Sequence, residues 1–516
     1  MGINFAARVG VKLKIQPINP EENLSIPANF ENEIDAFVNQ AMQAWNIPGL
    51  ALAIVKDDQV MLAKGYGVRD MGKTDPVDEH TLFAIGSNTK AFTATAIGLL
   101  VQAGKLTWDD PVTKYLPTFQ LYDSHTTHLL TIRDLLCHRS GLGTWAGDVL
   151  LLSSYPTEEV VRRLRHIPPD YSFRAGYGYS NLMFITAGLI IETVSGMSWD
   201  DFIRRRIFEP LGMIDSVTNP CYFENRTNIA TPHEDVRAKL QTVIYREDAH
   251  VGAAGSICAS VADIALWLRM QLTQGSLNGK QIVDAYILAE THTPHTPIKL
   301  TAIERKLFPS RHFSAYGLGW FLNDTYGRFI VRHTGGVDGM LSSTVFLPGE
   351  RIGIAVFTNK LPNSAFVVVS HYLIEKLLGI PPQDWIQIYT DLEKEEQEKG
   401  EKARQQRQAA RAKDTCPSLA LEKYAGAYDS PILGRATIRL PRSGNALQVQ
   451  LQAHESISGR LEHWHYDTFL CHWNDPVLGE SLIPFITDGQ GQVAEFRVKI
   501  RPDWIDPLEH VFKKMN

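Results

Sequence analysis

The chain has 516 residues, enough for more than one domain with a buried core, and its 44% hydrophobic and 21% charged residues are typical of a soluble globular protein. With 51 basic and 57 acidic residues, and a formal net charge of −6, it has no basic footprint of the kind that binds nucleic acid. Its five cysteines are scattered and odd in number, which argues against a disulfide framework and a zinc cluster, and no apolar run is long enough to span a membrane.

The beginning of the chain predicts an extension, a helix and a strand. Residues 1–29 are the predicted N-terminal extension. Its first 20 residues have neither the continuous apolar stretch nor the cleavage site of a secretory signal, so we expect a cytoplasmic protein, or a periplasmic one if a leader has been removed. An amphipathic helix is predicted over residues 31–45 and ends before Pro48. The apolar run 47–55 then predicts a core strand.

A serine and a lysine lie one helical turn apart at the start of the next helix. Ser87 precedes Lys90 by three residues, and residues 91–101 are apolar nearly all round, so this helix is predicted to be buried. A buried amine that stays neutral can take the serine's proton, and the free N–H groups of a helix N-terminus favour a developing negative charge. The alternative interpretation is a serine cap followed by a solvated lysine.

A tyrosine and an asparagine precede a second apolar helix, which is predicted over residues 182–194. Tyr179 follows the glycine-rich turn 174–178, and a phenol near ammonium groups is expected to have a lowered pKa that suits general acid–base catalysis. Asn181 can both donate and accept, which suits it to hold a lysine and a substrate amide. The alternative is a tyrosine packed in a turn, followed by the N-cap of the helix.

A third polar segment follows the predicted strand 328–331. It consists of His333, Thr334, Gly335 and Gly336. Glycines after a strand let a ligand approach the backbone closely, and a free N–H at a strand edge can complete an oxyanion hole. We therefore predict that this segment binds substrate, the alternative being a polar turn with a structural histidine.

The rest of the chain predicts one sandwich, a linker and a second small domain. Strands near 343–347 and 352–358 and a helix at 366–378 complete an α/β sandwich with an antiparallel sheet, bordered by an α-rich domain with the catalytic cleft between them. Residues 381–416 are rich in charges of both signs and predict a solvated helical linker. Residues 417–516 contain short β-like runs between turn signals, which predict a small antiparallel barrel or sandwich.

In this order the motifs resemble those of the serine β-lactamase and penicillin-binding-protein-like superfamily, most closely its class C β-lactamase and D-alanyl-D-alanine carboxypeptidase branch. The resemblance covers residues 30–379 and implies the β-lactamase-like fold, an antiparallel sheet flanked by helices plus an α-rich domain, for a serine hydrolase domain over residues 30–380. Residues 417–516 are similar to the lipocalin-like domain appended to some members. Supporting segments occur in the expected order at residues 47–55, 131–142, 208–213 and 316–320.

The resemblance implies a role for each motif residue. Ser87 corresponds to the acylated nucleophile, and Lys90 and Tyr179 to its proton-transfer partners, without deciding which of the two is the base. Asn181 positions Lys90 and the substrate. The backbone N–H groups of Ser87 and Gly336 form the oxyanion hole.

His333 stands where true class C β-lactamases have a lysine. A lysine supplies a fixed positive charge near a substrate carboxylate, whereas a histidine is mostly neutral at pH 7. The His-Thr-Gly sequence is found in carboxypeptidase-like and esterase-like relatives.

The predicted function is therefore that of a serine hydrolase that forms an acyl-enzyme at Ser87 with esters, D-amino-acid peptides or amides, or β-lactams. We expect a small-molecule or short-peptide substrate, no nucleic acid, no membrane span, no cofactor and no metal ion. Assembly into a homo-oligomer through the C-terminal domain is a hypothesis. The alternative function is that of a penicillin-binding or muropeptide-sensing protein, which acylates without efficient turnover.

Overall fold

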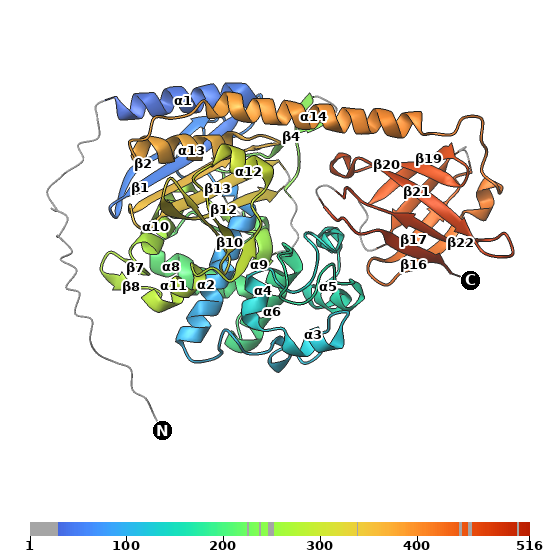
Figure 1. Ribbon diagram of the computed structural model, residues 1–516, viewed down its shortest axis with the longest axis horizontal. Helices are drawn as coiled ribbons and strands as arrows, with labels where there is room; N and C mark the ends of the chain where they lie inside the picture. Colours follow the sequence, from blue (N-terminus) through green and yellow to red (C-terminus); the bar gives the residue numbers. More distant parts are fainter. Residues whose placement is uncertain are drawn as a thin grey trace.

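The computed structural model describes residues 29–223, 226–236, 239–245, 252–337, 339–442, 446–452, 457–502 and 505–515. The predicted N-terminal extension, apart from residue 29, lies outside the described residues. Within them the chain forms an α/β domain, a long helix and a barrel, in that order (Figure 1).

The α/β domain is built on one sheet with the strand order β2-β1-β14-β13-β12-β11-β10-β9, and each neighbouring pair is antiparallel. Its strands are β1 (Gly49–Lys56), β2 (Gln59–Gly67), β9 (Thr296–Ile298), β10 (Ser314–Tyr316), β11 (Phe321–Thr325), β12 (Arg328–Val337), β13 (Met340–Leu347) and β14 (Ile352–Thr358). Smaller sheets are formed by β3 (Phe83–Ala84) with β6 (Cys258–Ala259), by β7 (Ser276–Leu277) with β8 (Lys280–Gln281), and by β15 (Lys360–Leu361), β4 (His233–Val236) and β5 (Lys239–Thr242).

Helices cover both faces of the large sheet (Figure 1). The helices on one face are α1 (Phe30–Trp45) and α13 (Ala365–Leu377), and those on the other include α2 (Thr89–Gln102) and α10 (Val261–Leu272). Because side chains alternate along a strand, Leu50, Leu52 and Ile54 of β1 belong to the core with α1 and α13. Ala51 and Ala53 belong to the core with α2 and α10. The predicted sandwich with an antiparallel sheet is confirmed.

An α-rich region borders this sheet and contains the second apolar helix of the sequence. Every residue of α6 from Leu182 to Ile191 is buried, so the helix runs through the middle of this region. The other helices of the α/β domain are α3 (Ser124–Leu129), α4 (Ile132–Leu136), α5 (Thr157–Arg163), α7 (Trp199–Ile203), α8 (Glu209–Leu211), α9 (Gly252–Gly255), α11 (Ala285–Thr291) and α12 (Ala302–Leu307), and α6 itself spans Asn181–Ser195.

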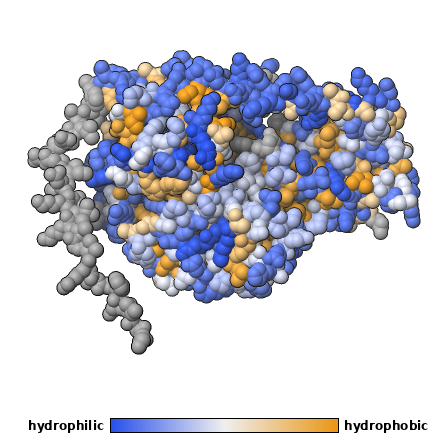
Figure 2. All heavy atoms as spheres, viewed as in Figure 1, coloured by the Kyte–Doolittle hydropathy of each residue, from blue (hydrophilic) through white to orange (hydrophobic). Residues whose placement is uncertain are grey.

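The long helix α14 (Trp385–Ala409) leads from the α/β domain to the barrel (Figure 1). Trp385 and Ile386 are its buried residues, and Ile388 and Tyr389 pack partly buried on the same core. From Glu393 onward the helix is polar on nearly all sides. Figure 2 shows hydrophilic residues along this edge of the molecule. The helix lies inside the segment 381–416 that composition predicts to be a charged linker.

The C-terminal domain is a closed barrel of antiparallel strands that runs from β16 through β23 in chain order, with β23 pairing back to β16. Its strands are β16 (Gly426–Ser430), β17 (Gly434–Arg439), β18 (Leu447–Leu451), β19 (Ser458–His465), β20 (Thr468–Trp473), β21 (Glu480–Thr487), β22 (Val493–Val498) and β23 (His510–Lys514). In β17 and β18 buried and less buried residues alternate, so one face of each strand fills the interior. The predicted small all-β domain is confirmed.

The barrel docks on the α-rich region through the turn between β16 and β17. Arg163 of α5 donates to the carbonyl of Ile432 at 2.9 Å, and its guanidinium lies 4.1 Å from the ring centroid of Tyr155. Tyr155 in turn donates to the carbonyl of Leu433 at 3.3 Å. Gly434 has φ +75, and a Cβ there would lie 2.2 Å from the Tyr155 hydroxyl, so glycine is required for this contact.

Among the described residues, no single helix is long and apolar enough to cross a membrane. The helices Asn181–Ser195 and Trp199–Leu211 are together long and apolar enough to cross a membrane, but they are bent by 75° relative to each other.

Candidate active site

Ser87 lies in a short 3-10 turn that passes directly into a buried helix. The turn η1 (Gly86–Asn88) is followed at once by α2. Gly86 has φ +51, and a Cβ at this position would lie 2.7 Å from the backbone nitrogen of Gly336. Only glycine fits such a close approach, so the turn packs tightly against β12. Ser87 itself is only half-buried, in contrast to its neighbours in the turn.

Lys90 is fully buried, and its amine lies among hydrogen-bond acceptors. Nζ lies 3.0 Å from Ser87 Oγ, 2.6 Å from Asn181 Oδ1 and 2.7 Å from the carbonyl oxygen of Ala254. The last two oxygens only accept, so the amine donates one hydrogen to each. A neutral amine has two hydrogens and one lone pair, and this lone pair is then directed at the Ser87 hydroxyl.

The environment of Lys90 favours that neutral form. Burial lowers the pKa of its amine to about 7, although the carboxyl of Asp148 acts in the opposite direction. The solvated lysine of the alternative interpretation is not observed, because the side chain is 0% exposed. The predicted proximity of Ser87 and Lys90 is present in the structure.

Tyr179 ends the loop that leads into α6, and its ring packs against Lys90. The Lys90 Nζ lies 4.9 Å from the ring centroid. Burial of the hydroxyl raises the pKa of Tyr179 well above its ordinary value, while a hydrogen bond with Ser87 lowers it in part. The expectation of a lowered pKa is therefore wrong, because desolvation outweighs the hydrogen bond with Ser87. Tyr179 is a protonated phenol at neutral pH.

Asn181 is the first residue of α6 and joins Lys90 to an acidic side chain. Its Oδ1 accepts from Lys90, and its Nδ2 donates to Asp148 Oδ2 at 2.6 Å. Burial raises the pKa of the Asp148 carboxyl to about 8, although the hydrogen bond from Asn181 lowers it in part. Asp148 opens the 3-10 turn η3 (Asp148–Leu152), a segment in which the sequence shows no motif.

His333 lies on β12 with both ring nitrogens bonded inside the protein. Its Nδ1 lies 2.7 Å from the carbonyl oxygen of Thr334, which only accepts, so Nδ1 carries the hydrogen. Its Nε2 therefore accepts from the Tyr316 hydroxyl at 2.8 Å. Burial lowers the pKa of His333 to about 3, so the ring is neutral. Its direct contact with substrate stays a prediction.

The segment from His333 to Gly336 forms a strand edge that faces the serine turn. Strand β12 pairs with β13 as far as Val337, whereas its pairing with β11 ends at Arg332. Along this edge a Cβ at Gly335 would lie 1.9 Å from the carbonyl oxygen of Ile85. The glycines thus bring the backbone of β12 next to η1, where the oxyanion hole is predicted.

His138 orders the loop around Tyr179, a role that the sequence did not reveal. Its backbone has φ +58, and its Nδ1 accepts from the backbone N–H of Ser180 at 3.0 Å. Its ring centroid lies 4.3 Å from that of Tyr179 and 4.5 Å from that of Tyr316. Burial lowers the pKa of His138 well below its ordinary value, so this ring is also neutral.

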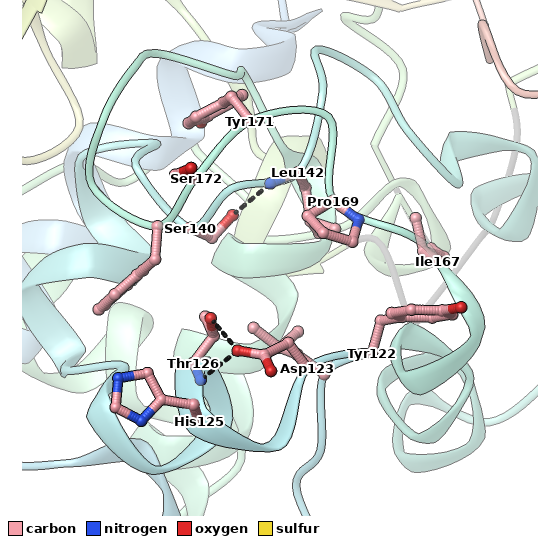
Figure 3. Close-up of a pocket in the computed structure, with 12 residues that line it drawn as sticks. Tyr122, Asp123, His125, Thr126, Ser140, Leu142, Ile167, Pro169, Tyr171 and Ser172 are labelled. Atoms are coloured by element: carbon pink, nitrogen blue, oxygen red, sulfur yellow. Dashed lines mark hydrogen bonds between the residues drawn. The ribbon is translucent and has the colours of Figure 1, made fainter.

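A separate pocket of about 450 Å³ lies among the loops of the α-rich region (Figure 3). It is lined largely by apolar and aromatic side chains, and none of the predicted site residues lines it. In Figure 3 the side chain of Asp123 accepts from Thr126, and that of Ser140 accepts from the backbone N–H of Leu142. In the part of the chain that the structure describes, no group of histidine, cysteine and acidic residues is arranged to hold a metal ion.

Two family models match the chain. The model of the family described as Beta-lactamase matches residues 34–378, and that of a domain of unknown function, DUF3471, matches residues 410–511. Unguisins hydrolase ungD' of Aspergillus campestris (strain IBT 28561) is 31% identical over 443 residues, which cover 80% of this chain and 78% of that protein.

Solved structures share the fold. The octameric penicillin-binding protein homologue from Pyrococcus abyssi superposes with a TM-score of 0.60 at 23% identity, covering 94% of this chain and 100% of that chain. A class C β-lactamase from Rhodobacter sphaeroides gives a TM-score of 0.56 at 22% identity, covering 67% of this chain and 99% of that chain. The predicted β-lactamase-like fold is confirmed.

The chain belongs to the Beta-lactamase family. It is a serine hydrolase of the superfamily that includes β-lactamases and penicillin-binding proteins, with an all-β barrel appended at its C-terminal end.

Proposed function

We propose that the protein hydrolyses esters, D-amino-acid peptides or amides, or β-lactams through an acyl-enzyme formed on Ser87. The observation that carries the proposal is the placement of the Lys90 amine 3.0 Å from Ser87 Oγ, with its two other neighbours able only to accept. This arrangement supports Lys90 as the base and Ser87 as the nucleophile. The same site without turnover would be that of a binding protein, and the test below separates the two.

The acylation step follows from the protonation states. Lys90 takes the Ser87 proton while Oγ bonds to the substrate carbonyl carbon, and the negative charge on the carbonyl oxygen is held by the backbone N–H groups of Ser87 and Gly336. When the intermediate collapses, the bond to the leaving group breaks and that group takes a proton from the Tyr179 phenol. The Lys90 proton passes to Tyr179, which restores both groups.

Deacylation reverses these roles with water as the nucleophile. Lys90 takes a proton from water while the hydroxide bonds to the acyl carbon, and Ser87 leaves with the proton. The product acid departs and the free enzyme is regenerated. Every proton is accounted for by Ser87, Lys90, Tyr179 and water, with Asn181 holding Lys90 in place.

The substrate class follows from the neutral His333. A lysine at this position would attract a substrate carboxylate, and the ring here is uncharged and bonded to Tyr316 and Thr334. We therefore expect better turnover of esters and peptide amides than of substrates that depend on a free carboxylate. The relative named Unguisins hydrolase supports a hydrolytic function.

A substrate panel tests the proposal. We expect the wild-type protein to turn over p-nitrophenyl esters and D-alanyl amides faster than D-alanyl peptides with a free carboxylate, to be acylated by nitrocefin, and to lose these activities in Ser87→Ala. Stoichiometric labelling of Ser87 without turnover would establish the binding function instead. Activity that survives undiminished in Ser87→Ala would contradict the proposal altogether.

We propose also that the full chain assembles into a homo-oligomer through its barrel. The support is the Pyrococcus abyssi homologue, which is described as octameric and matches 94% of this chain. Size-exclusion chromatography with light scattering on the full chain is expected to give a mass that is a multiple of 57.8 kDa. A monomer at all concentrations would contradict assembly and leave the catalytic proposal untouched.

A further inference from the structure

A line of hydrogen bonds leads from the serine nucleophile to Asp148. Ser87 Oγ contacts Lys90 Nζ, Lys90 donates to Asn181 Oδ1, and Asn181 Nδ2 donates to Asp148 Oδ2 at 2.6 Å. Asp148 is 5% exposed and follows Gly147, whose φ of +84 turns the chain into η3. Burying a carboxyl costs free energy unless hydrogen bonds compensate for the lost hydration, and the partner of this carboxyl is Asn181.

The Asn181 amide has two distinct ends, and Asp148 decides which end faces Lys90. In the observed orientation the amide oxygen meets the amine that donates, and the amide nitrogen meets a carboxyl oxygen that accepts. A flipped amide would set two donors against each other at Lys90 and two acceptors against each other at Asp148. Without an acceptor at position 148, nothing on that side would oppose the flip.

We propose that Asp148 is a positioning residue for catalysis, an inference that rests on the proposed function. It holds the Asn181 amide with its oxygen toward Lys90, and thereby keeps the lone pair of the amine directed at the Ser87 hydroxyl. Asp148 does not touch substrate in this role. It acts through Asn181 and Lys90 alone.

Asp148 also bears on the charge of Lys90. The titratable groups that interact with it are Lys90 from α2, Tyr179 from the loop before α6, and Asp506 from the barrel. Asp506 is fully buried and lies 3.1 Å from His510 Nε2. An anionic Asp148 raises the pKa of Lys90. Burial raises the pKa of Asp148 to about 8, so its carboxyl is mostly neutral where Lys90 loses its proton, and its role is carried by the hydrogen bond with Asn181.

A second buried acid offers a matched control. Asp263 is 3% exposed, and its Oδ2 accepts from the backbone N–H of Asp215 and of Ser216 at 2.9 and 2.8 Å. Burial raises its pKa to about 6. Asp263 thus resembles Asp148 in burial but bonds only to structural groups.

The experiment compares three variants of the full chain in p-nitrophenyl ester hydrolysis from about pH 5.5 to 9. Asp148→Leu removes the acceptor and is expected to lower kcat/KM by about 10- to 100-fold, mostly in kcat. Asp148→Asn keeps an oxygen that accepts from Asn181, so we expect kcat/KM near wild type at high pH. The midpoint of its pH profile is expected to stay close to that of wild type, because Asp148 carries little charge in the pH range where Lys90 loses its proton. Asp263→Asn is expected to leave both kcat/KM and the midpoint of the pH profile unchanged.

A purely structural role of Asp148 would predict a different result. In that case kcat of the folded protein would be the same whether or not position 148 offers an acceptor to Asn181. If Asp148→Leu does not fold, the smaller Asp148→Ala takes its place, and a wild-type kcat in that variant overturns the proposal. A wild-type kcat/KM in folded Asp148→Leu overturns it equally. Ser87→Ala is measured beside these variants as a control on the proposed function. If Ser87→Ala stays active, the proposed function itself fails. If Ser87→Ala is inactive, a failed expectation for Asp148 counts against the positioning role alone.

Discussion

Lys90 Nζ lies 3.0 Å from Ser87 Oγ, and the two residues are one helical turn apart at the entrance to α2. Because the other acceptors of Lys90 take both hydrogens of a neutral amine, its lone pair is left for the serine proton. The sequence left open whether Lys90 or Tyr179 is the base. The pKa shifts favour Lys90, since that of Lys90 is lowered to about 7 and that of Tyr179 is raised.

The first prediction concerns the pH dependence of the wild-type protein. The proposed base is the neutral form of Lys90, whose pKa burial lowers to about 7. Below that pH the amine is protonated and cannot accept, so kcat/KM is expected to rise with pH through about 7. Ester hydrolysis measured in buffers of constant ionic strength checks this. A profile that is flat across neutral pH would contradict a lysine base.

A second prediction concerns the charge of that amine. Lys90→Arg keeps a cation that does not lose its proton, and we expect kcat to fall by about 10²- to 10⁴-fold at all pH values. In Lys90→Met, whose side chain is apolar and of similar length, kcat is expected to fall by the same factor. This variant buries no charge. The test is ester turnover together with a thermal melt of each variant. Retained activity in either variant would assign the base to another group.

The third prediction separates the acid from the base. Tyr179→Phe keeps the ring that packs against Lys90 and removes only the hydroxyl. We expect a loss of about 10²- to 10⁴-fold on a peptide amide, whose nitrogen must gain a proton in order to leave. A p-nitrophenyl ester should lose much less, because p-nitrophenolate leaves without a proton. Equal losses on both substrates would argue against Tyr179 as the acid.

Sequence reasoning found those site residues whose contacts are set by local spacing. Ser87 and Lys90 are close because one turn of helix separates them. Tyr179 and Asn181 were recognised because they precede an apolar helix, which carries them into the α-rich region. The family resemblance supplied their common location, which spacing alone does not give.

Other features depend on tertiary contacts that the sequence does not encode in a readable pattern. Asp148 lies in a segment without a motif and meets Asn181 only in the folded chain. The Ala254 carbonyl, which accepts from Lys90, is a backbone atom and leaves no side-chain signal. The pKa of Tyr179 was predicted in the wrong direction, because the degree of desolvation is a property of packing.

A fourth prediction tests how the loop before Tyr179 is held. Asp134 is fully buried, and its carboxylate accepts from Arg139 Nε at 2.5 Å and from Arg174 Nη2 at 2.7 Å. Asp134→Asn removes the charge and leaves two guanidinium groups uncompensated. We expect the free energy of unfolding to fall by about 3 kcal/mol, the lower end for buried pairs because Arg174 is partly exposed. Urea denaturation checks this, with exposed Asp170→Asn as the neutral control.

The same group gives a pH dependence with a definite sign. Burial acts to raise the pKa of Asp134, but the hydrogen bonds from Arg174, Thr131 and Arg139 hold it below its ordinary value of 3.8. The stabilising contribution is therefore complete above pH 3.8 and is lost as the pH falls through the lower, folded-state pKa. Wild type and Asp134→Asn should accordingly converge in stability at acidic pH. A constant difference down to the acid transition would contradict this.

The last prediction concerns the contact between the barrel and the α-rich region. Gly434→Ala places a Cβ 2.2 Å from the Tyr155 hydroxyl, which must move, and with it Arg163, whose guanidinium packs on that ring. Gly479→Ala is the matched control, because Gly479 also has a positive φ, +64, but has nothing within 4 Å of its Cβ position.

Both variants carry the backbone cost of a left-handed residue, about 1 kcal/mol, and only Gly434→Ala also loses the docking contact. We therefore expect limited proteolysis to cut near α14 faster in Gly434→Ala than in Gly479→Ala. Calorimetry should resolve a separate barrel transition in Gly434→Ala alone. Strain at a positive φ acts within the barrel in both variants. Equal cleavage rates, with the barrel unfolding together with the rest of the chain in both, would therefore mean that the contact of Gly434 with Tyr155 does not hold the barrel in place.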